Sequence, residues 1–244
     1  MIERRTKTIA LLGSSTVAGK GQAFDLIGEL QKREQNKDLA LMNFGVGGDL
    51  AYNALLRVSE VVTAHPDKII ILIGANDILA SVFENVWRIF HTTKHVPQRP
   101  SAEWFRTNVT AIVRELKSKT PALIALASIP QVGEDSYSKN PAQAKLNALY
   151  REYADIIKQI AADEDIAYLP LYERLHDALE ASPKRAFTRF RFLPFYWDTF
   201  RYFVLHKSGD EIARENGWHF HVDGVHLNSR GGMLVADALQ EFLR

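Results

Sequence analysis

The run Gly13-Ser14-Ser15-Thr16 has residue types and a position that could support acyl-transfer chemistry, because it directly follows a short apolar stretch. A serine on a tight turn between a strand and a helix exposes its hydroxyl group and can offer its own amide N–H to an oxyanion. Ser15 is therefore a candidate nucleophile. The alternative is that the serines and the threonine only cap the following helix.

Two more candidate groups follow the next apolar stretches. Residues 43–49 are rich in glycine, which lets a backbone N–H approach a substrate oxygen because no Cβ stands in the way. Asn76 lies in residues 74–77, and its side-chain amide is a neutral donor suited to a developing oxyanion. Either segment could instead be an ordinary turn.

Near the carboxyl terminus, Asp223 precedes His226 by three residues. A histidine that acts as a general base needs a carboxylate to fix its tautomer, and a turn of this length can place the two side chains together. Taken alone the pair is weak support, because the chain has eight histidines.

The elements that must position these residues follow from the hydrophobic pattern. Continuous apolar runs predict strands buried on both faces, and they occupy residues 8–12, 39–43, 68–73, 122–127 and 166–169. Helical patterns separate them, including one that begins at Asn140-Pro141 and a last one from about Ser229. The alternation predicts an α/β fold, a three-layer sandwich with a parallel sheet of five strands. Ligands bind at the carboxyl ends of such strands, where the candidates lie.

Two segments do not fit the regular alternation, namely residues 78–100 and 183–220. We expect one catalytic domain over residues 1–244, with these two segments as lids or inserts over one end of the sheet.

Aromatic residues are concentrated in the second insert. Residues 187–203 hold nine of the chain's 25 aromatic residues, and arginines lie within and beside them. We expect the rings to pack as a lid, with Phe195, Trp197 and Phe200 contacting substrate. The alternative is a peripheral membrane contact through residues 185–206, or a non-catalytic module that binds acyl chains or an anionic lipid surface.

Composition excludes several other classes. The chain has 244 residues, a formal net charge of +1 and no cysteine, which rules out disulfides, zinc-thiolate sites and a thiol nucleophile. Near neutrality gives no reason to expect nucleic acid as a partner. No apolar run is long enough to span a bilayer or to form a signal peptide, so we expect a cytoplasmic protein.

Two other site types are weaker alternatives. A phosphate-binding loop would need a different spacing between Gly13 and Gly19-Lys20, and a serine or threonine where Gly21 stands. A metal-dependent hydrolase could use His219, His221, Asp223 and His226, but that would leave the first three candidate groups without a role.

The serine, glycine, asparagine and Asp/His blocks occur in one order along the whole chain, and this pattern resembles the SGNH hydrolases, or GDSL-type esterases and lipases. The resemblance implies a flavodoxin-like fold and a catalytic triad of Ser15, Asp223 and His226. It also implies an oxyanion hole formed by the Ser15 amide, Gly48 and Asn76. The implied reaction is hydrolysis of a carboxylic ester through an acyl-enzyme, with neither cofactor nor metal.

The sequence departs from the family pattern at two positions. Ser14 stands where the family usually has aspartate, and Gly47 where it often has serine. Neither replacement removes a catalytic group, although Gly45 or Gly47 could replace Gly48 as the oxyanion glycine.

The substrate is expected to be a small-molecule ester with a hydrophobic or medium-chain acyl group, because of the aromatic segment. Carbohydrate O-acetyl esters, lysophospholipids and thioesters, which the same family covers, are the alternatives. The sequence does not indicate an oligomeric state.

Overall fold

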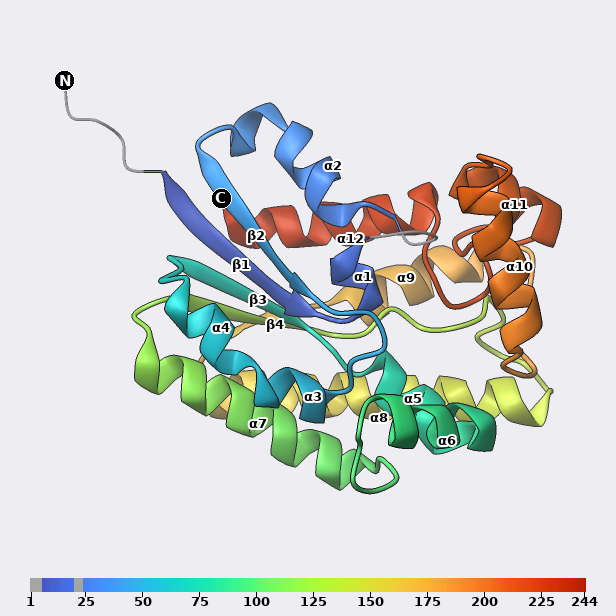
Figure 1. The fold of residues 1–244 in the computed structure, drawn as a ribbon, viewed down its shortest axis with the longest axis horizontal. Helices are drawn as coiled ribbons and strands as arrows, with labels where there is room; N and C mark the ends of the chain where they lie inside the picture. The colour runs from blue at the N-terminus through green and yellow to red at the C-terminus, as the bar shows by residue number, and fades with distance from the viewer. Residues whose placement is uncertain (1–5, 20–23) are drawn as a thin grey trace.

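The computed structural model describes residues 6–19 and 24–244, and it contains a five-stranded parallel sheet (Figure 1). The strand order is β2-β1-β3-β4-β5. The bounds are β1 Lys7–Gly13, β2 Leu39–Gly45, β3 Lys68–Leu72, β4 Leu123–Ala127 and β5 Ala167–Leu169. These strands lie where the apolar runs predict them, and the α/β fold class is confirmed.

The register of the sheet brings the ends of three strands together. Gly13 at the end of β1 pairs with Gly45 of β2 on one side and with Leu72 of β3 on the other. Residues that directly follow β1, β2 and β3 therefore start from neighbouring points at one edge. This edge is where the serine, glycine and asparagine segments must meet.

Helices cover both faces of the sheet. Their bounds are α1 Ser15–Ala18, α2 Leu26–Lys32, the 3-10 helix η1 Glu34–Asn36, α3 Ala51–Leu56, α4 Val58–Thr63, α5 Ala75–Val82, α6 Glu84–Thr93, α7 Ala102–Lys119, α8 Pro141–Asp163, α9 Leu171–Glu180, α10 Phe192–Phe203, α11 Gly209–Asn216 and α12 Ser229–Leu243. The predicted start of α8 is confirmed, because Asn140 caps it by accepting from the N–H groups of Ala142 and Gln143. The start of α12 at Ser229 is confirmed as well.

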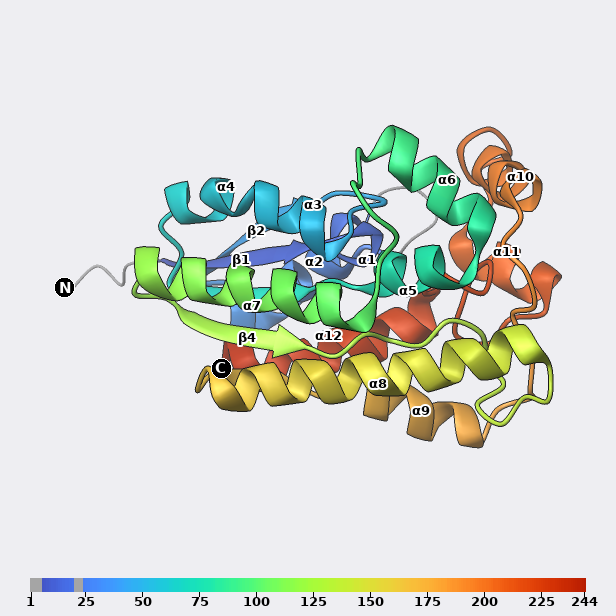
Figure 2. The ribbon, with the colours of Figure 1, turned by 90° about the horizontal axis from the view of Figure 1, so that it is seen from below.

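Two apolar cores lie on opposite sides of the sheet (Figures 1 and 2). Helices α3, α4, α5, α7 and α8 pack on one face, while α1, α2, α9 and α12 pack on the other. Strand β1 shows why its apolar run is continuous, since Ala10 and Leu12 enter the first core and Ile9 and Leu11 the second. Because both faces of the strand are buried, its apolar residues do not alternate with polar ones.

The two segments outside the regular alternation contain helices of their own. Residues 78–100 hold most of α5 and all of α6, and residues 183–220 hold α10 and α11. Both segments lie beyond the end of the sheet to which the strands point (Figures 1 and 2). Their role as lids, and the single catalytic domain, stay predictions.

Within the described residues, no helix is both long enough and apolar enough to cross a bilayer. The phosphate-loop alternative depends on Lys20 and Gly21, which lie outside the described residues, as does most of the basic amino terminus.

Candidate active site

The candidate nucleophile lies at the turn between β1 and α1. Ser15 is the first residue of α1, and the carbonyl of Ser14 accepts from the N–H groups of Val17 and Ala18. Gly13 has no room for a side chain, because a Cβ there would lie 2.4 Å from the carbonyl oxygen of Leu72. The turn is thus packed tightly on the sheet, with Ser14 buried and Ser15 on a cavity wall.

One cavity of about 440 Å³ brings the predicted residues together. Its wall includes Ser15, Gly48, Asn76 and His226, which the sequence spreads over more than two hundred positions. The rest of the wall is mostly apolar and comes from α5, α6, α10 and the segments beside them: Gly47, Leu79, Val86, Phe90, Phe190, Phe192, Phe195, Tyr196, Thr199, Phe203 and Val225.

The structure distinguishes among the three candidate oxyanion glycines. Gly48 has a φ of +80°, in the left-handed region that favours glycine, and a Cβ there would lie 2.8 Å from Cε of Lys94. Gly47 also lines the cavity. Gly45 instead ends β2, and a Cβ on it would lie 2.2 Å from the backbone nitrogen of Ala18. Gly45 therefore packs under α1, and the wall positions are Gly47 and Gly48.

Asn76 is held in place by a backbone carbonyl. Its Nδ2 donates to the Asp49 carbonyl oxygen at 2.9 Å, which leaves the second N–H of that amide for another acceptor. The next residue, Asp77, is fully buried and accepts from the Ala51 N–H at 3.0 Å. Burial raises the pKa of Asp77 to about 7. Together the two residues tie the start of α5 to the glycine segment.

The side chain of Asp49 fixes the other side of that segment. Its carboxylate is 2.7 Å from Nε of Arg57 and 2.9 Å from Nζ of Lys94. Arg57 also donates from Nη2 to the Gly13 carbonyl oxygen at 3.0 Å. Arg57 and Lys94 were not expected from the sequence, because neither stands in a motif and only the fold brings them to Asp49.

Asp223 and His226 form the pair that their spacing predicts. His226 Nδ1 is 2.8 Å from Asp223 Oδ2, while Asp223 Oδ1 accepts from the N–H groups of Val225 and His226 at 2.9 and 2.8 Å. Val222 N–H donates to the His226 carbonyl at 2.7 Å and closes the turn. With Nδ1 donating to the carboxylate, Nε2 is the nitrogen left to accept a proton.

The pair changes the acid–base properties of both groups. Burial alone raises the pKa of the Asp223 carboxyl, but the charge and hydrogen bonds of His226 outweigh it and lower that pKa to about 2. Burial alone lowers the pKa of His226, and the Asp223 carboxylate outweighs it and raises that pKa above its ordinary value. Asp223 is thus a stable anion that supports the protonated form of His226.

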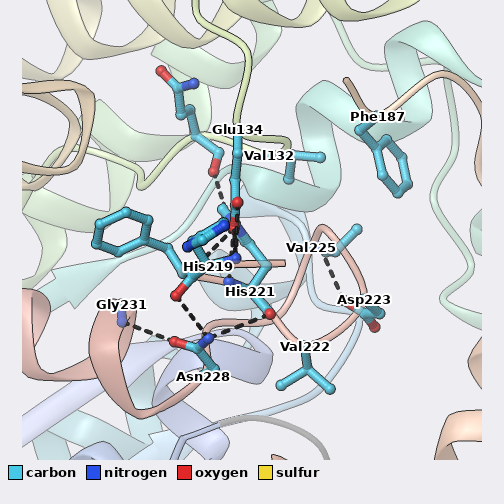
Figure 3. Close-up of polar contacts among 12 residues, drawn as sticks. Val132, Glu134, Phe187, His219, His221, Val222, Asp223, Val225, Asn228 and Gly231 are labelled. Carbon is cyan, nitrogen blue, oxygen red and sulfur yellow. Dashed lines mark hydrogen bonds and ion pairs between the residues drawn. The ribbon is translucent and has the colours of Figure 1, made fainter. Parts of the chain in front are cut away.

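A second buried pair, His221 and Glu134, lies near this turn and engages one of the histidines that a metal site would need (Figure 3). His221 Nδ1 is 2.9 Å from Glu134 Oε1, and its Nε2 is 3.0 Å from the Gln131 carbonyl oxygen. Among the described residues, no three side chains of metal-binding types are grouped to hold an ion. Glu134 was not expected from the sequence, since nothing marks it in the segment after β4.

The structure places the three aromatic residues predicted to contact substrate in different surroundings, and their contact with substrate stays a prediction. Phe195 lines the cavity and its ring centroid is 5.7 Å from that of His226. Trp197 and Phe200, expected beside it, are 58% and 42% exposed and stack on each other away from the wall. Each residue turns a helix by about 100°, so these two side chains diverge from Phe195. Phe192 and Phe203 of the same helix line the cavity instead.

Comparisons with known proteins identify a family and a shared fold. The model of the GDSL-like lipase/acylhydrolase family matches residues 11–232. Among curated proteins, no relative matches the sequence.

Solved structures share the fold at low sequence identity. A catalytic mutant of Axe2, an acetylxylan esterase from Geobacillus stearothermophilus, is 16% identical, with a TM-score of 0.64 over 99% of this chain and 95% of that chain. The acetyl xylan esterase AlAXEase is 18% identical, with a TM-score of 0.64 over 97% and 100%. A lipase/acylhydrolase from Enterococcus faecalis is 18% identical, with a TM-score of 0.61 over 97% and 95%. The shared fold and the family match, which spans most of the chain, establish that this chain belongs to the GDSL-like lipase/acylhydrolase family.

Proposed function

We propose that this protein is a serine hydrolase that cleaves carboxylic esters with hydrophobic, medium-length acyl groups. One observation carries the proposal: a single cavity holds Ser15, Gly48, Asn76 and His226 against an otherwise mainly apolar wall. In this proposal Ser15 is the nucleophile, Gly48 and Asn76 are oxyanion donors, and His226 is the base. The apolar wall suits an acyl chain.

The reaction follows from the roles of these groups. His226 Nε2 takes the proton of the Ser15 hydroxyl as Ser15 Oγ attacks the ester carbonyl carbon. The Ser15 and Gly48 amides and the free N–H of Asn76 stabilise the oxyanion of the tetrahedral intermediate. His226 then gives its proton to the leaving alkoxide, and the acyl group remains on Ser15 as an ester.

Water completes the cycle by the same steps. His226 takes a proton from the water molecule as its oxygen attacks the acyl-enzyme carbonyl, and the second tetrahedral intermediate releases the carboxylic acid and Ser15. Throughout, Asp223 holds Nδ1 and stabilises the imidazolium that forms in each half-reaction. No cofactor is required by this chemistry.

The acyl preference is inferred from the cavity wall. Apart from the proposed catalytic groups, the side chains on it are apolar or aromatic, with Thr199 as the exception besides the hydroxyl of Tyr196. Each buried methylene contributes up to about 0.8 kcal/mol, so binding should improve as the acyl chain lengthens until the cavity is full.

A carbohydrate O-acetyl ester is the second candidate, because two of the solved structures that share this fold are acetylxylan esterases. The mostly apolar wall offers few partners for sugar hydroxyls, and this is why we rank it below the acyl ester. Lysophospholipids and thioesters remain within the proposed chemistry.

We also propose a peripheral membrane contact through residues 185–206. The outer face of α10 exposes Leu193, Trp197 and Phe200, which do not line the cavity, and Leu193 is 83% exposed. Arg189 and Arg191 precede this face and are exposed. Apolar side chains flanked by exposed cations suit the surface of an anionic bilayer.

A panel of nitrophenyl esters with acyl chains from acetyl to dodecanoyl tests the acyl preference. We expect kcat/KM to rise from acetate to a medium-chain maximum, with no turnover above background by the Ser15→Ala variant. An acetylated xylooligosaccharide is measured in parallel. Faster release of acetate from that sugar than hydrolysis of any nitrophenyl ester would favour the carbohydrate esterase instead.

A further inference from the structure

The segment after β4 reaches the turn that carries the candidate Asp/His pair. The ends of β1, β2 and β3 lead to the serine, glycine and asparagine groups, whereas the end of β4 leads to residues 128–134. Gly133 N–H donates to the carbonyl oxygen of Gly224 at 2.9 Å. Because Gly224 lies between Asp223 and His226, the fourth strand is tied directly to the middle of the turn.

Glu134, the next residue, binds the backbone of residues 219–221, which lead into the turn. Its side chain is fully buried, and its Oε1 accepts from the N–H groups of Phe220 and His221 at 2.7 and 3.0 Å. Its Oε2 accepts from the N–H of His219 at 2.9 Å. Three consecutive backbone N–H groups thus converge on one carboxylate (Figure 3).

His221 completes this anchor with its ring. The ring is fully buried, and its two nitrogens face the Glu134 carboxylate and the Gln131 carbonyl, which can only accept. Both ring nitrogens therefore lie within hydrogen-bond distance of an oxygen that accepts. Burial alone raises the pKa of Glu134, but the hydrogen bond and charge of His221 and the backbone N–H groups outweigh it and lower that pKa.

The anchor also fixes the far side of the turn. His221 pairs with Leu227 in an antiparallel bridge, so the two ends of the turn are joined below Asp223 and His226. Asn228 then donates from Nδ2 to the carbonyl of His219 at 3.0 Å (Figure 3). The turn is therefore supported by the paired residues 219–221 and 227–228. Glu134, which follows β4, binds the first of these two segments.

We propose that Glu134, acting with His221, is a positioning residue that sets where His226 Nε2 lies relative to Ser15. The inference rests on the proposed serine hydrolase function. Glu134 does not line the cavity, so its action passes through the turn and not through substrate. A displacement of about 1 Å in a catalytic group can cost on the order of 100-fold in rate.

The Glu134→Gln variant tests this role, because glutamine keeps the shape and one acceptor oxygen but removes the charge that His221 faces. We expect kcat to fall about 10-fold to 100-fold while KM stays within about threefold, since the acyl wall is untouched. Glu173→Gln is the matched control. Glu173 accepts from Ser128 Oγ and Tyr168 OH, and neither of these hydrogen bonds reaches the residues of the turn. We expect kcat of the control within twofold of the wild-type value.

Two further readouts separate positioning from a loss of stability. The rate at which a fluorophosphonate labels Ser15 depends on His226 acting as base, and we expect it to fall in Glu134→Gln as kcat does. The NMR signal of the His226 Nδ1 proton should shift or broaden in that variant and stay unchanged in Glu173→Gln. His221→Gln is a second variant with the same expectations, and circular dichroism selects an assay temperature at which every variant is folded.

The outcomes distinguish the two proposals. If a folded Glu134→Gln or His221→Gln protein keeps wild-type kcat and labelling rate, the positioning role is overturned. If the drop in kcat is matched by Glu173→Gln, the effect is general and the positioning role is likewise overturned. If the wild-type protein itself is neither labelled nor active on any ester, the proposed function fails, whatever the variants do.

Discussion

Two sides of the cavity are built in different ways. On the strand side, Ser15, Gly48 and Asn76 follow directly from β1, β2 and β3 and are tied to one another by buried polar contacts around Asp49. On the helix side, α10 presents Phe195 inward through apolar packing and leaves Trp197 on the surface. The difference suggests that the strand side determines the chemistry and the helix side determines which acyl group is accepted.

The largest loss of kcat is expected when the Asp223 carboxylate, which supports the base His226, is neutralised. Asp223→Asn keeps the shape of the side chain but removes the charge that fixes Nδ1 and supports the imidazolium. We expect kcat to fall on the order of 10⁴-fold for every acyl length. Rates measured with acetyl and octanoyl nitrophenyl esters check this, and a drop confined to one chain length would contradict the division between the two sides.

A smaller loss is expected at the oxyanion donor. Asn76→Ala removes one preorganised N–H, which typically costs about 100-fold to 1000-fold in kcat, with KM nearly unchanged. Asn108→Ala is the control, because Asn108 is also buried but donates to the Trp104 carbonyl within α7, away from the cavity. If Asn76→Ala instead raised KM at constant kcat, Asn76 would contribute to substrate binding and not to stabilisation of the oxyanion.

The pH dependence of kcat/KM should be set by the catalytic groups, and in particular by His226, and not by the residues of α10. The base acts when neutral, so kcat/KM should fall about tenfold for each pH unit below the pKa of His226. Because Asp223 raises that pKa above its ordinary value of 6.5, the midpoint should lie above pH 6.5 and should move down in Asp223→Asn. A rate profile that stays flat from pH 5 to 8, with chemistry rate-limiting, would exclude His226 as the base.

The smallest effects are expected on the helix side, where two rings of one helix form a matched pair. Phe195→Ala should reduce the preference for medium chains over acetate by several-fold, because it removes apolar wall, and acetate hydrolysis should change little. Trp197→Ala should leave the chain-length preference unchanged and weaken sedimentation with anionic vesicles. If Trp197→Ala alters chain-length preference and Phe195→Ala does not, the assignment of the two faces is wrong.

The sequence predicts the strand side well for a physical reason. A strand buried on both faces must be apolar throughout, so β1 and β3 and the residues that follow them can be located from the sequence alone. The short spacing of Asp223 and His226 likewise makes their contact a local property of one turn. These features do not depend on how distant parts of the chain pack.

The remaining parts depend on tertiary packing. The rotation of α10 decides that Phe195 faces the cavity while Trp197 and Phe200 face outward, and an aromatic residue is acceptable on either side. Arg57 and Glu134 lie in no motif and gain their partners only when separate segments fold together. The roles of such residues cannot be predicted from the spacing of motifs or from hydrophobic periodicity.

The most direct measurement of the central claim is the site of covalent labelling by a fluorophosphonate, read by mass spectrometry of the digested protein. The account predicts one modified residue, Ser15, with labelling that slows as His226 becomes protonated and disappears in Ser15→Ala. Labelling at Ser14, or ester hydrolysis at the wild-type rate by the Ser15→Ala protein, would contradict it.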